Sequence, residues 1–230
     1  MLVSETLIGA AGREVPIALD PLFAGAAPLR LGSNELLYMP EEPAQQVYLI
    51  VEGEVRLYKI NADGREFTLG IYAAGDMIGE AEALAGTRRA CYAMARGPAQ
   101  LLAHDARRFL HILSDSPAQA LRLARFVCRK NRLIERKMES LLFKSAHARV
   151  AEQLLALADQ FAKPAENRCH EVVNIDYPIT HQEIANLIGA TRETVSYVLL
   201  DFKAMELIDT GRRRIAIRDL AGLKEMASAS

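Results

Sequence analysis

Hydrophobic and polar positions alternate with a period close to two along the first half of the sequence. Between Leu36 and Leu102, apolar runs such as VYLIVEGEVRLYKI are separated by turn-forming segments such as NADGRE. This alternation is typical of β-strands, and Asp63-Gly64 supplies the residues that tight hairpin turns require. Gly53 interrupts the first run, so we expect a strand on either side of it. The pattern predicts a compact antiparallel β-roll.

After Pro117 the pattern becomes that of one long helix, because AQALRLARFVCRKNRLIERKMESLLF contains neither Gly nor Pro. Positions at alternating spacings of four and three form a heptad seam: Ala120, Ala124, Val127, Asn131, Ile134, Met138 and Leu141. Such a seam packs either on its own domain or on a copy of itself. We favour self-pairing, because Leu123, Phe126 and Leu133 form a second apolar strip that can face the β-roll. The polar Asn131 would then fix the register of the pair.

From about residue 146 onward, helical signals return. KSAHARVAEQLLALADQFA predicts an amphipathic helix, and the segment after it predicts a loop with one short strand. Lys144 to Ala146 is a candidate hinge. We therefore expect an α+β chain in three parts: a β-roll domain over 1–116, a long dimerisation helix over 117–145 and a C-terminal domain over 146–230.

The stretch ITHQEIANLIGATRETVSYVLLDF contains two sets of helix-end signals. Thr180 followed three residues later by Glu183 predicts a capping box at the start of the first helix. Gly189 can end that helix in the left-handed conformation, and Thr191 can cap the next. The spacing also lets the two helices share one interior, formed by Ile184, Ile188, Val195, Val198 and Leu199. These features predict a helix-turn-helix with 192–204 as the recognition helix.

The first turn of this second helix places arginine beside glutamate. Arginine can donate two hydrogen bonds to guanine and glutamate can accept one from cytosine, so Arg192 and Glu193 are candidate base readers. Two packed core helices with an inert surface pair are the alternative. That alternative leaves unexplained why the first turn would expose Arg192, Glu193, Ser196 and Tyr197 together. Downstream, ELIDTGRRRIAIRD predicts two short strands around Gly211, with arginines at the tip of a wing that can meet phosphates or, alternatively, form a solvated turn. The candidate DNA contacts are Thr180, Gln182, Thr191, Arg192, Glu193, Ser196, Tyr197, Arg212, Arg213 and Arg214.

Charge is unevenly divided along the chain, although the net formal charge is only -1. Lys and Arg number 10 against 15 Asp and Glu in residues 1–116, 8 against 2 in 117–145, and 10 against 12 in 146–230. The chain thus lacks the overall basic balance of a nonspecific nucleic-acid binder, and DNA binding must come from a local arrangement. Neither a membrane-spanning run nor the basic start of a signal peptide is present, so we expect a cytoplasmic protein with no membrane partner.

An enzyme of the metal-binding β-roll type is the main alternative class. The first histidine is His104, so the strands predicted over 36–102 contain no histidine to hold a metal. The three cysteines lie far apart, which offers neither a disulfide framework nor an iron-sulfur or zinc signature. No G-x-S-x-G, G-x-x-x-x-G-K or H-E-x-x-H motif occurs. We predict no metal site, no catalytic residues and no enzymatic activity.

From Leu36 onward the chain resembles the cyclic-AMP receptor protein/FNR family of bacterial transcription regulators. The resemblance is carried by VEGEVRLYK, AGDMIGE, the long central helix and ITHQEIANLIGATRETVSYVL. It implies a homodimer with a cyclic-nucleotide-binding-like β-roll, a dimerising helix and a winged helix that reads a palindrome, and it implies RNA polymerase as a partner. Family members of this pattern read a TGTGA-like half-site with the residues that match Arg192 and Glu193, whereas Tyr197 stands where an arginine is usual.

The same resemblance implies an effector pocket. Its residues are Gly79, Glu80, Arg88 or Arg89 as the phosphate-binding arginine, Ile134 and Glu135. Ala90 replaces the serine that holds the cyclic phosphate in nucleotide binders, and Ile134 and Glu135 replace the pair that meets the adenine. No cofactor is certain, and for cyclic AMP we hypothesise weak binding or none. A cyclic-nucleotide-dependent activator and a repressor that acts by occupying a promoter remain the alternatives.

Overall fold

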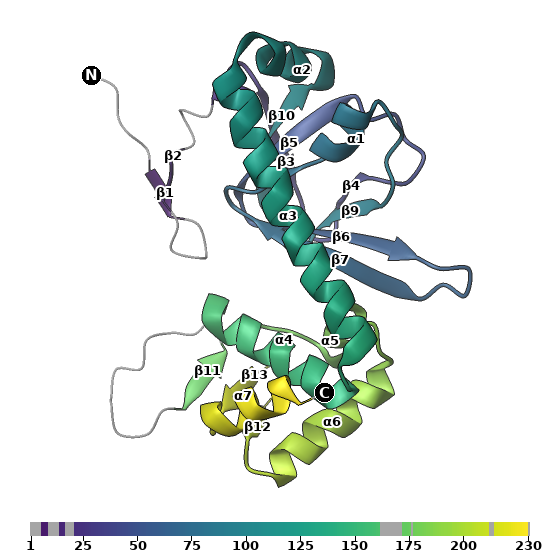
Figure 1. The fold of residues 1–230 in the computed structure, drawn as a ribbon, viewed down its shortest axis with the longest axis vertical. Coiled ribbons are helices and arrows are strands. Elements are labelled where there is room, and N and C mark those ends of the chain that lie inside the picture. The colour runs from purple at the N-terminus through teal and green to yellow at the C-terminus, as the bar shows by residue number, and fades with distance from the viewer. Residues whose placement is uncertain are drawn as a thin grey trace. The chain divides into compact units, whose positions relative to one another are not determined.

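The computed structural model describes residues 6–8, 14–16, 21–161, 172–175, 177–211 and 214–229. Contacts divide the chain into two units, residues 1–132 and 133–230, with the boundary inside helix α3, Pro117–Phe143. In Figure 1 the sheets of the first unit lie beside the first part of this long helix, and the second unit is mainly helical.

The first unit is built from antiparallel strands. They are β1 Thr6–Ile8, β2 Glu14–Pro16, β3 Ala27–Leu31, β4 Leu36–Tyr38, β5 Gln46–Glu52, β6 Glu54–Ile60, β7 Glu66–Ala73, β8 Met77–Ile78, β9 Tyr92–Ala95 and β10 Ala99–Asp105. β1 pairs with β2, and two four-stranded sheets have the orders β3-β10-β5-β8 and β4-β9-β6-β7. The predicted β-roll is confirmed, with the expected break between β5 and β6 at Gly53. It begins earlier than expected, since β3 precedes Leu36.

Strand β5 is buried on both faces, because alternate side chains of a strand point to opposite sides of the sheet. Tyr48 and Ile50 belong to the core between the two sheets. Val47 and Leu49 belong to a second core on the other face, together with Phe109. This double burial explains why the run VYLIV is almost continuously apolar.

Helices cover that second core. They are α1 Glu80–Ala85, α2 Ala106–Asp115 and the N-terminal part of α3, with a 3-10 turn at Pro21–Phe23. From α3, Leu123 is buried and Phe126 packs against the core, as expected. Leu133 does not continue this strip, because 58% of its surface is exposed. Lys130, one turn after Phe126, makes polar contacts with Met77 of β8 and Glu80 of α1.

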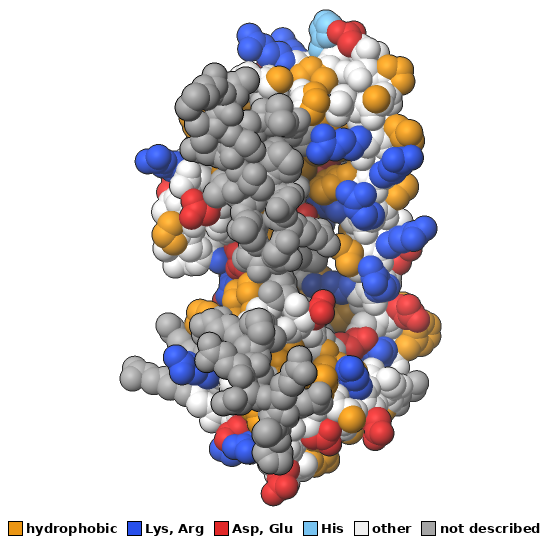
Figure 2. Space-filling view, turned by 90° about the vertical axis from the view of Figure 1, so that its left-hand side faces the viewer, with side chains coloured by type: hydrophobic (Ala, Val, Ile, Leu, Met, Phe, Trp, Pro, Cys, Tyr) orange, Lys and Arg blue, Asp and Glu red, His pale blue; other side chains and the backbone are white. Residues whose placement is uncertain are grey.

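Most of the predicted seam lies on the surface of α3. Ala120, Ala124, Val127, Asn131, Ile134 and Met138 are exposed, and Leu141 is half-buried. Figure 2 shows Lys and Arg side chains along one edge of the molecule, interleaved with hydrophobic ones. An apolar helix face bordered by basic residues is the surface expected of a helix that pairs with another.

The second unit combines a helical core with a small sheet. Its elements are α4 Ala146–Phe161, β11 Val173–Ile175, α5 His181–Ile188, α6 Arg192–Ala204, β12 Ile208–Gly211, β13 Arg214–Ile217 and α7 Leu220–Ser228. The strands form an antiparallel sheet in the order β11-β13-β12. α3 ends at Phe143, directly before the predicted hinge. Within the described ranges, no helix is long and apolar enough to span a bilayer.

Candidate functional site

Both helices of the helix-turn-helix begin at the predicted caps. The Thr180 hydroxyl accepts from the Glu183 backbone N–H at 3.2 Å, and the Glu183 carboxylate accepts from the Thr180 N–H at 2.8 Å, which completes the capping box. Gly189 ends α5 in the left-handed conformation, with φ of 65°. The Thr191 hydroxyl accepts from the Thr194 N–H at 3.2 Å at the start of α6. Local sequence signals therefore set the start of both helices and the end of α5.

The two helices share a buried interior. Ile184, Ile188, Val195, Val198 and Leu199 are all buried, as their spacing predicted. This interior leaves one side of α6 facing solvent.

Helix α4 also holds the end of α5. The Arg149 Nη1 donates to the Ile188 carbonyl at 2.7 Å, where the last turn of a helix has free acceptors. The sequence reasoning missed this contact, since a single arginine on a helix carries no signal of it.

The exposed start of α6 presents the candidate base readers. Arg192 and Glu193 are both exposed. Tyr197 is 63% exposed, one turn further on, and its ring lies edge-on to the His147 ring, with centroids 6.3 Å apart. The His147 Nε2 lies 2.9 Å from an Asp201 carboxylate oxygen. α4 therefore supports the same part of α6 that carries Tyr197.

Ser196 differs from the expectation that it is exposed together with its neighbours. It is half-buried, and its hydroxyl lies 2.8 Å from the His181 Nδ1 on α5. The amide of Gln182 donates to the Asn186 side chain at 2.8 Å while the residue itself remains exposed. Ser196 thus joins the two helices, and Arg192, Glu193 and Tyr197 are the exposed candidates at the start of α6.

The predicted wing is present as the β12-β13 hairpin. Arg214 begins β13 and is exposed, whereas Arg212 and Arg213 lie outside the described residues. At the base of the hairpin, the Arg218 guanidinium donates to the Asp209 carboxylate at 2.8 Å. This hydrogen bond is the main reason that the pKa of Asp209 is lowered.

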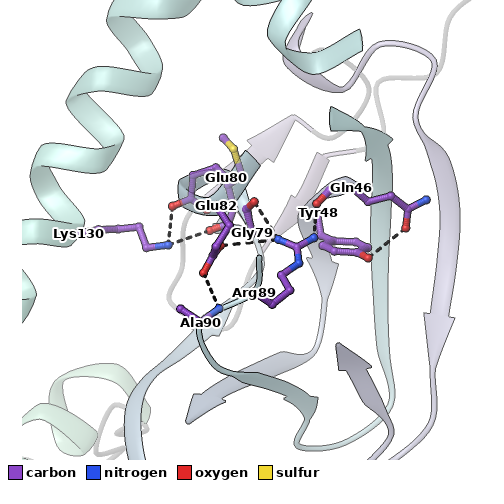
Figure 3. A network of polar contacts seen from close by, with 9 residues as sticks. Gln46, Tyr48, Gly79, Glu80, Glu82, Arg89, Ala90 and Lys130 are labelled. Carbon is purple, nitrogen blue, oxygen red and sulfur yellow. Dashed lines mark hydrogen bonds and ion pairs between the residues drawn. The ribbon is translucent and has the colours of Figure 1, made fainter. Parts of the chain in front are cut away.

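Arg89 is the arginine that lies inside the β-roll. It is 2% exposed and packs its guanidinium over the Tyr38 ring, with Cζ 4.3 Å from the centroid. Its Nη1 donates to the Gly79 carbonyl at 3.0 Å and its Nη2 donates to the Gln46 carbonyl at 2.5 Å (Figure 3). The Glu82 carboxylate lies 3.7 Å from Nη1. The protein itself therefore satisfies much of the hydrogen-bonding capacity of this guanidinium.

Glu80 is equally buried, at 2% exposed, and faces Lys130 of α3. The Lys130 Nζ lies 2.7 Å from Glu80 Oε1, while Glu80 Oε2 has no hydrogen-bond partner among the described residues. The Lys130 ammonium also lies 4.7 Å from the centroid of the Tyr72 ring. Burial, with a smaller contribution from the Glu80 charge, raises the pKa of Tyr72 to about 12. The sequence reasoning did not single out Lys130.

The other candidate effector residues lie elsewhere. Arg88 is exposed and donates to the Glu41 carbonyl. Ile134 and Glu135 are exposed on α3. Of the two arginines considered for the pocket, Arg89 is therefore the one that shares the buried site with Gly79 and Glu80.

Comparisons with known proteins agree with this architecture. Residues 28–116 match the profile of the cyclic nucleotide-binding domain family, and residues 148–226 match that of the Crp-like helix-turn-helix domain family. The transcriptional regulator LdrP of Thermus thermophilus is 34% identical over 87% of this chain and 97% of its own length. A protein named cyclic AMP receptor protein from the same species is 31% identical over 90% of this chain and 97% of its own.

A solved structure shows the same fold. TTHB099, a transcriptional regulator of the CRP family from Thermus thermophilus, superimposes with a TM-score of 0.71 at 31% identity, covering 88% of this chain and 97% of its own. The paired domains, the helix-turn-helix geometry and these relatives lead to one conclusion. The chain belongs to the cyclic-AMP receptor protein/FNR family of sequence-specific DNA-binding transcription regulators.

Proposed function

We propose that this regulator binds a palindromic TGTGA-like site as a homodimer and does so without cyclic AMP. The observation that carries the proposal is the exposed first turn of α6, where Arg192 and Glu193 project from a helix that is capped by Thr191. Arginine can donate to O6 and N7 of guanine, and glutamate can accept from N4 of cytosine in the adjacent base pair. Phosphate contacts from Arg214 and its neighbours Arg212 and Arg213 at the wing would add affinity without sequence preference.

The exposed face of α3 supports dimerisation. Val127, Ile134 and Met138 are 38%, 51% and 56% exposed, although they are spaced like core residues of a coiled coil. Burying each such side chain fully contributes about 1.5–3 kcal/mol. Asn131 lies within this face and can bond its counterpart only in an aligned pair. Dimeric binding predicts two half-sites about one helical turn, roughly 34 Å, apart.

The hydrogen bonds that Arg89 makes inside the protein support DNA binding without cyclic AMP. Its donors already serve the carbonyls of Gly79 and Gln46, and an incoming phosphate would compete with them. Ala90 offers no hydroxyl to such a phosphate. Displacing satisfied hydrogen bonds of a buried cation has a free-energy cost that weakens binding.

In this proposal residues 1–116 form the sensor-type domain, 117–145 the dimerisation helix and 146–230 the DNA-binding domain. The protein acts in the cytoplasm as a regulator and not as an enzyme, and it contacts RNA polymerase when it activates. Promoter occupancy alone would instead give repression. A reporter assay in which the site is moved relative to the promoter separates the two modes, because only activation through contact depends on the helical phase of the site.

The direct test is binding of the full chain to a TGTGA palindrome, to one half-site and to a scrambled duplex at one fixed salt concentration. We expect tight binding to the palindrome and a footprint over both half-sites. Arg192→Ala should lower affinity for the palindrome much more than for the scrambled duplex, whereas the exposed Arg125→Ala serves as a matched loss of charge on α3. Equal affinity of the unaltered protein for all three duplexes would contradict the proposal.

A further inference from the structure

Lys130 places a cation in a partly buried site between α3 and the sheet. Its Nζ lies 2.7 Å from Glu80 Oε1 and 3.4 Å from the Met77 carbonyl oxygen. Aromatic rings flank the ammonium, with the centroids of Tyr72 and Phe126 at 4.7 Å and 5.4 Å. The lysine side chain is only 18% exposed. Two acceptors and two ring contacts therefore surround one flexible side chain.

Without the ion pair between Lys130 and Glu80, this buried arrangement would destabilise the fold. A long lysine side chain loses rotamer freedom when it is ordered, and a buried carboxylate without a partner is strongly destabilising. Glu80 is 2% exposed, and its Oε2 has no hydrogen-bond partner among the described residues, so Lys130 supplies the one opposite charge seen on this carboxylate. Surface ion pairs contribute little, but this pair is partly buried, so water and salt screen it less.

The Lys130–Glu80 ion pair connects two functional parts of the first unit. The residue directly precedes Asn131 in the exposed seam and follows Phe126 by one turn. Glu80 is the first residue of α1, at the glycine turn that also receives the Arg89 guanidinium. The ion pair therefore connects the turn that holds Arg89 to the helix that carries the predicted dimer face.

We propose that Lys130 is a built-in substitute for an effector. Its ammonium pairs with the Glu80 carboxylate in the sensor pocket and thereby holds α3 on the β-roll without a small molecule. The inference rests on the proposed function and deepens it, because it names the residues that make DNA binding independent of a nucleotide. Lys130 is a positioning residue in this account, and it contacts no DNA.

The test combines two variants and a control in the full-length, nucleotide-free protein. Lys130→Met removes the cation and keeps the length of the side chain. Glu80→Gln with Lys130→Met also removes the carboxylate charge, so that no buried charge is left unpaired. Arg125→Met removes an exposed charge from the same helix. Hydrogen exchange of α3 residues 121–132 and affinity for the palindrome are measured for each protein, after circular dichroism has confirmed folding.

We expect both Lys130 variants to exchange faster in α3 and to lose about tenfold or more in DNA affinity, equivalent to about 1.4 kcal/mol. Arg125→Met should stay within about twofold, as is usual for surface substitutions. Wild-type behaviour of the double variant would overturn the inference, since only the unpaired charge would then matter. Unchanged exchange in both variants would also overturn it. Exchange reports on the ion pair without DNA, so failure of the unaltered protein to bind the palindrome would count against the proposed function alone.

Discussion

Replacing Gly79 by alanine tests the buried position of Arg89. Gly79 adopts φ of 80° and ψ of 5°, and the left-handed conformation costs a residue with a Cβ about 1–2 kcal/mol. A Cβ at this position would also meet the Arg89 guanidinium, with Cζ at 3.1 Å and Nη2 at 3.3 Å. Displacing the guanidinium breaks its hydrogen bond to the Gly79 carbonyl, a further loss of about 1.5–3 kcal/mol. The free energy of unfolding of the β-roll should therefore fall by about 2.5–5 kcal/mol.

Gly86→Ala is the matched control, because Gly86 also has a positive φ, 65°, but a Cβ there would lie in open space. It should cost only the backbone strain, about 1–2 kcal/mol. Urea unfolding followed by tyrosine fluorescence measures both variants, since the chain contains no tryptophan. Equal losses for the two variants would refute the placement of Arg89 against Gly79. In an Arg89→Met background the excess loss of Gly79→Ala should disappear.

Three further outcomes are expected. Thr180→Ala removes the capping hydroxyl of α5 and should lower the free energy of unfolding by about 1 kcal/mol, as measured by urea denaturation. Arg192→Ala should cost about 1–3 kcal/mol of DNA affinity and relax discrimination at one G·C pair, whereas Arg214→Ala should weaken all sequences alike and reduce the salt dependence, as measured by anisotropy titrations. Exposed Cys128 should be alkylated at pH 8 far sooner than Cys91, whose pKa burial raises to about 11, and peptide mapping identifies the labelled thiol.

The helix-turn-helix could be predicted from sequence because its signals are local. Each signal acts within a few residues of the helix end that it sets. In the structure α5 begins after Thr180, with Glu183 completing the capping box, and ends at Gly189, and α6 begins after Thr191. Strand alternation likewise predicted the β-roll. The six-residue α1 and the helix α2 were missed, since the first is too short to show a period and the second directly follows β10.

Contacts between residues far apart in the sequence could not be predicted from the periodicity of hydrophobic positions. Lys130 belongs to a segment rich in Lys and Arg, so its sequence context predicts a solvated side chain, yet its partner Glu80 lies 50 positions earlier. For the same reason Leu133 was wrongly placed against the roll, where Lys130 takes that role. Ser196 was expected to be exposed, but a histidine on the preceding helix lies within hydrogen-bonding distance of its hydroxyl. Each difference arises from tertiary contacts that override a local pattern.

The most direct test of the account is the affinity of the purified, nucleotide-free protein for a TGTGA-type palindrome at fixed salt, with and without cyclic AMP. We expect tight, sequence-specific binding in both cases, with affinities that agree within about tenfold. A dependence on cyclic AMP of about 100-fold or more, equivalent to about 2.7 kcal/mol, would contradict it. That result would mean that Glu80 and Arg89 open to receive the nucleotide.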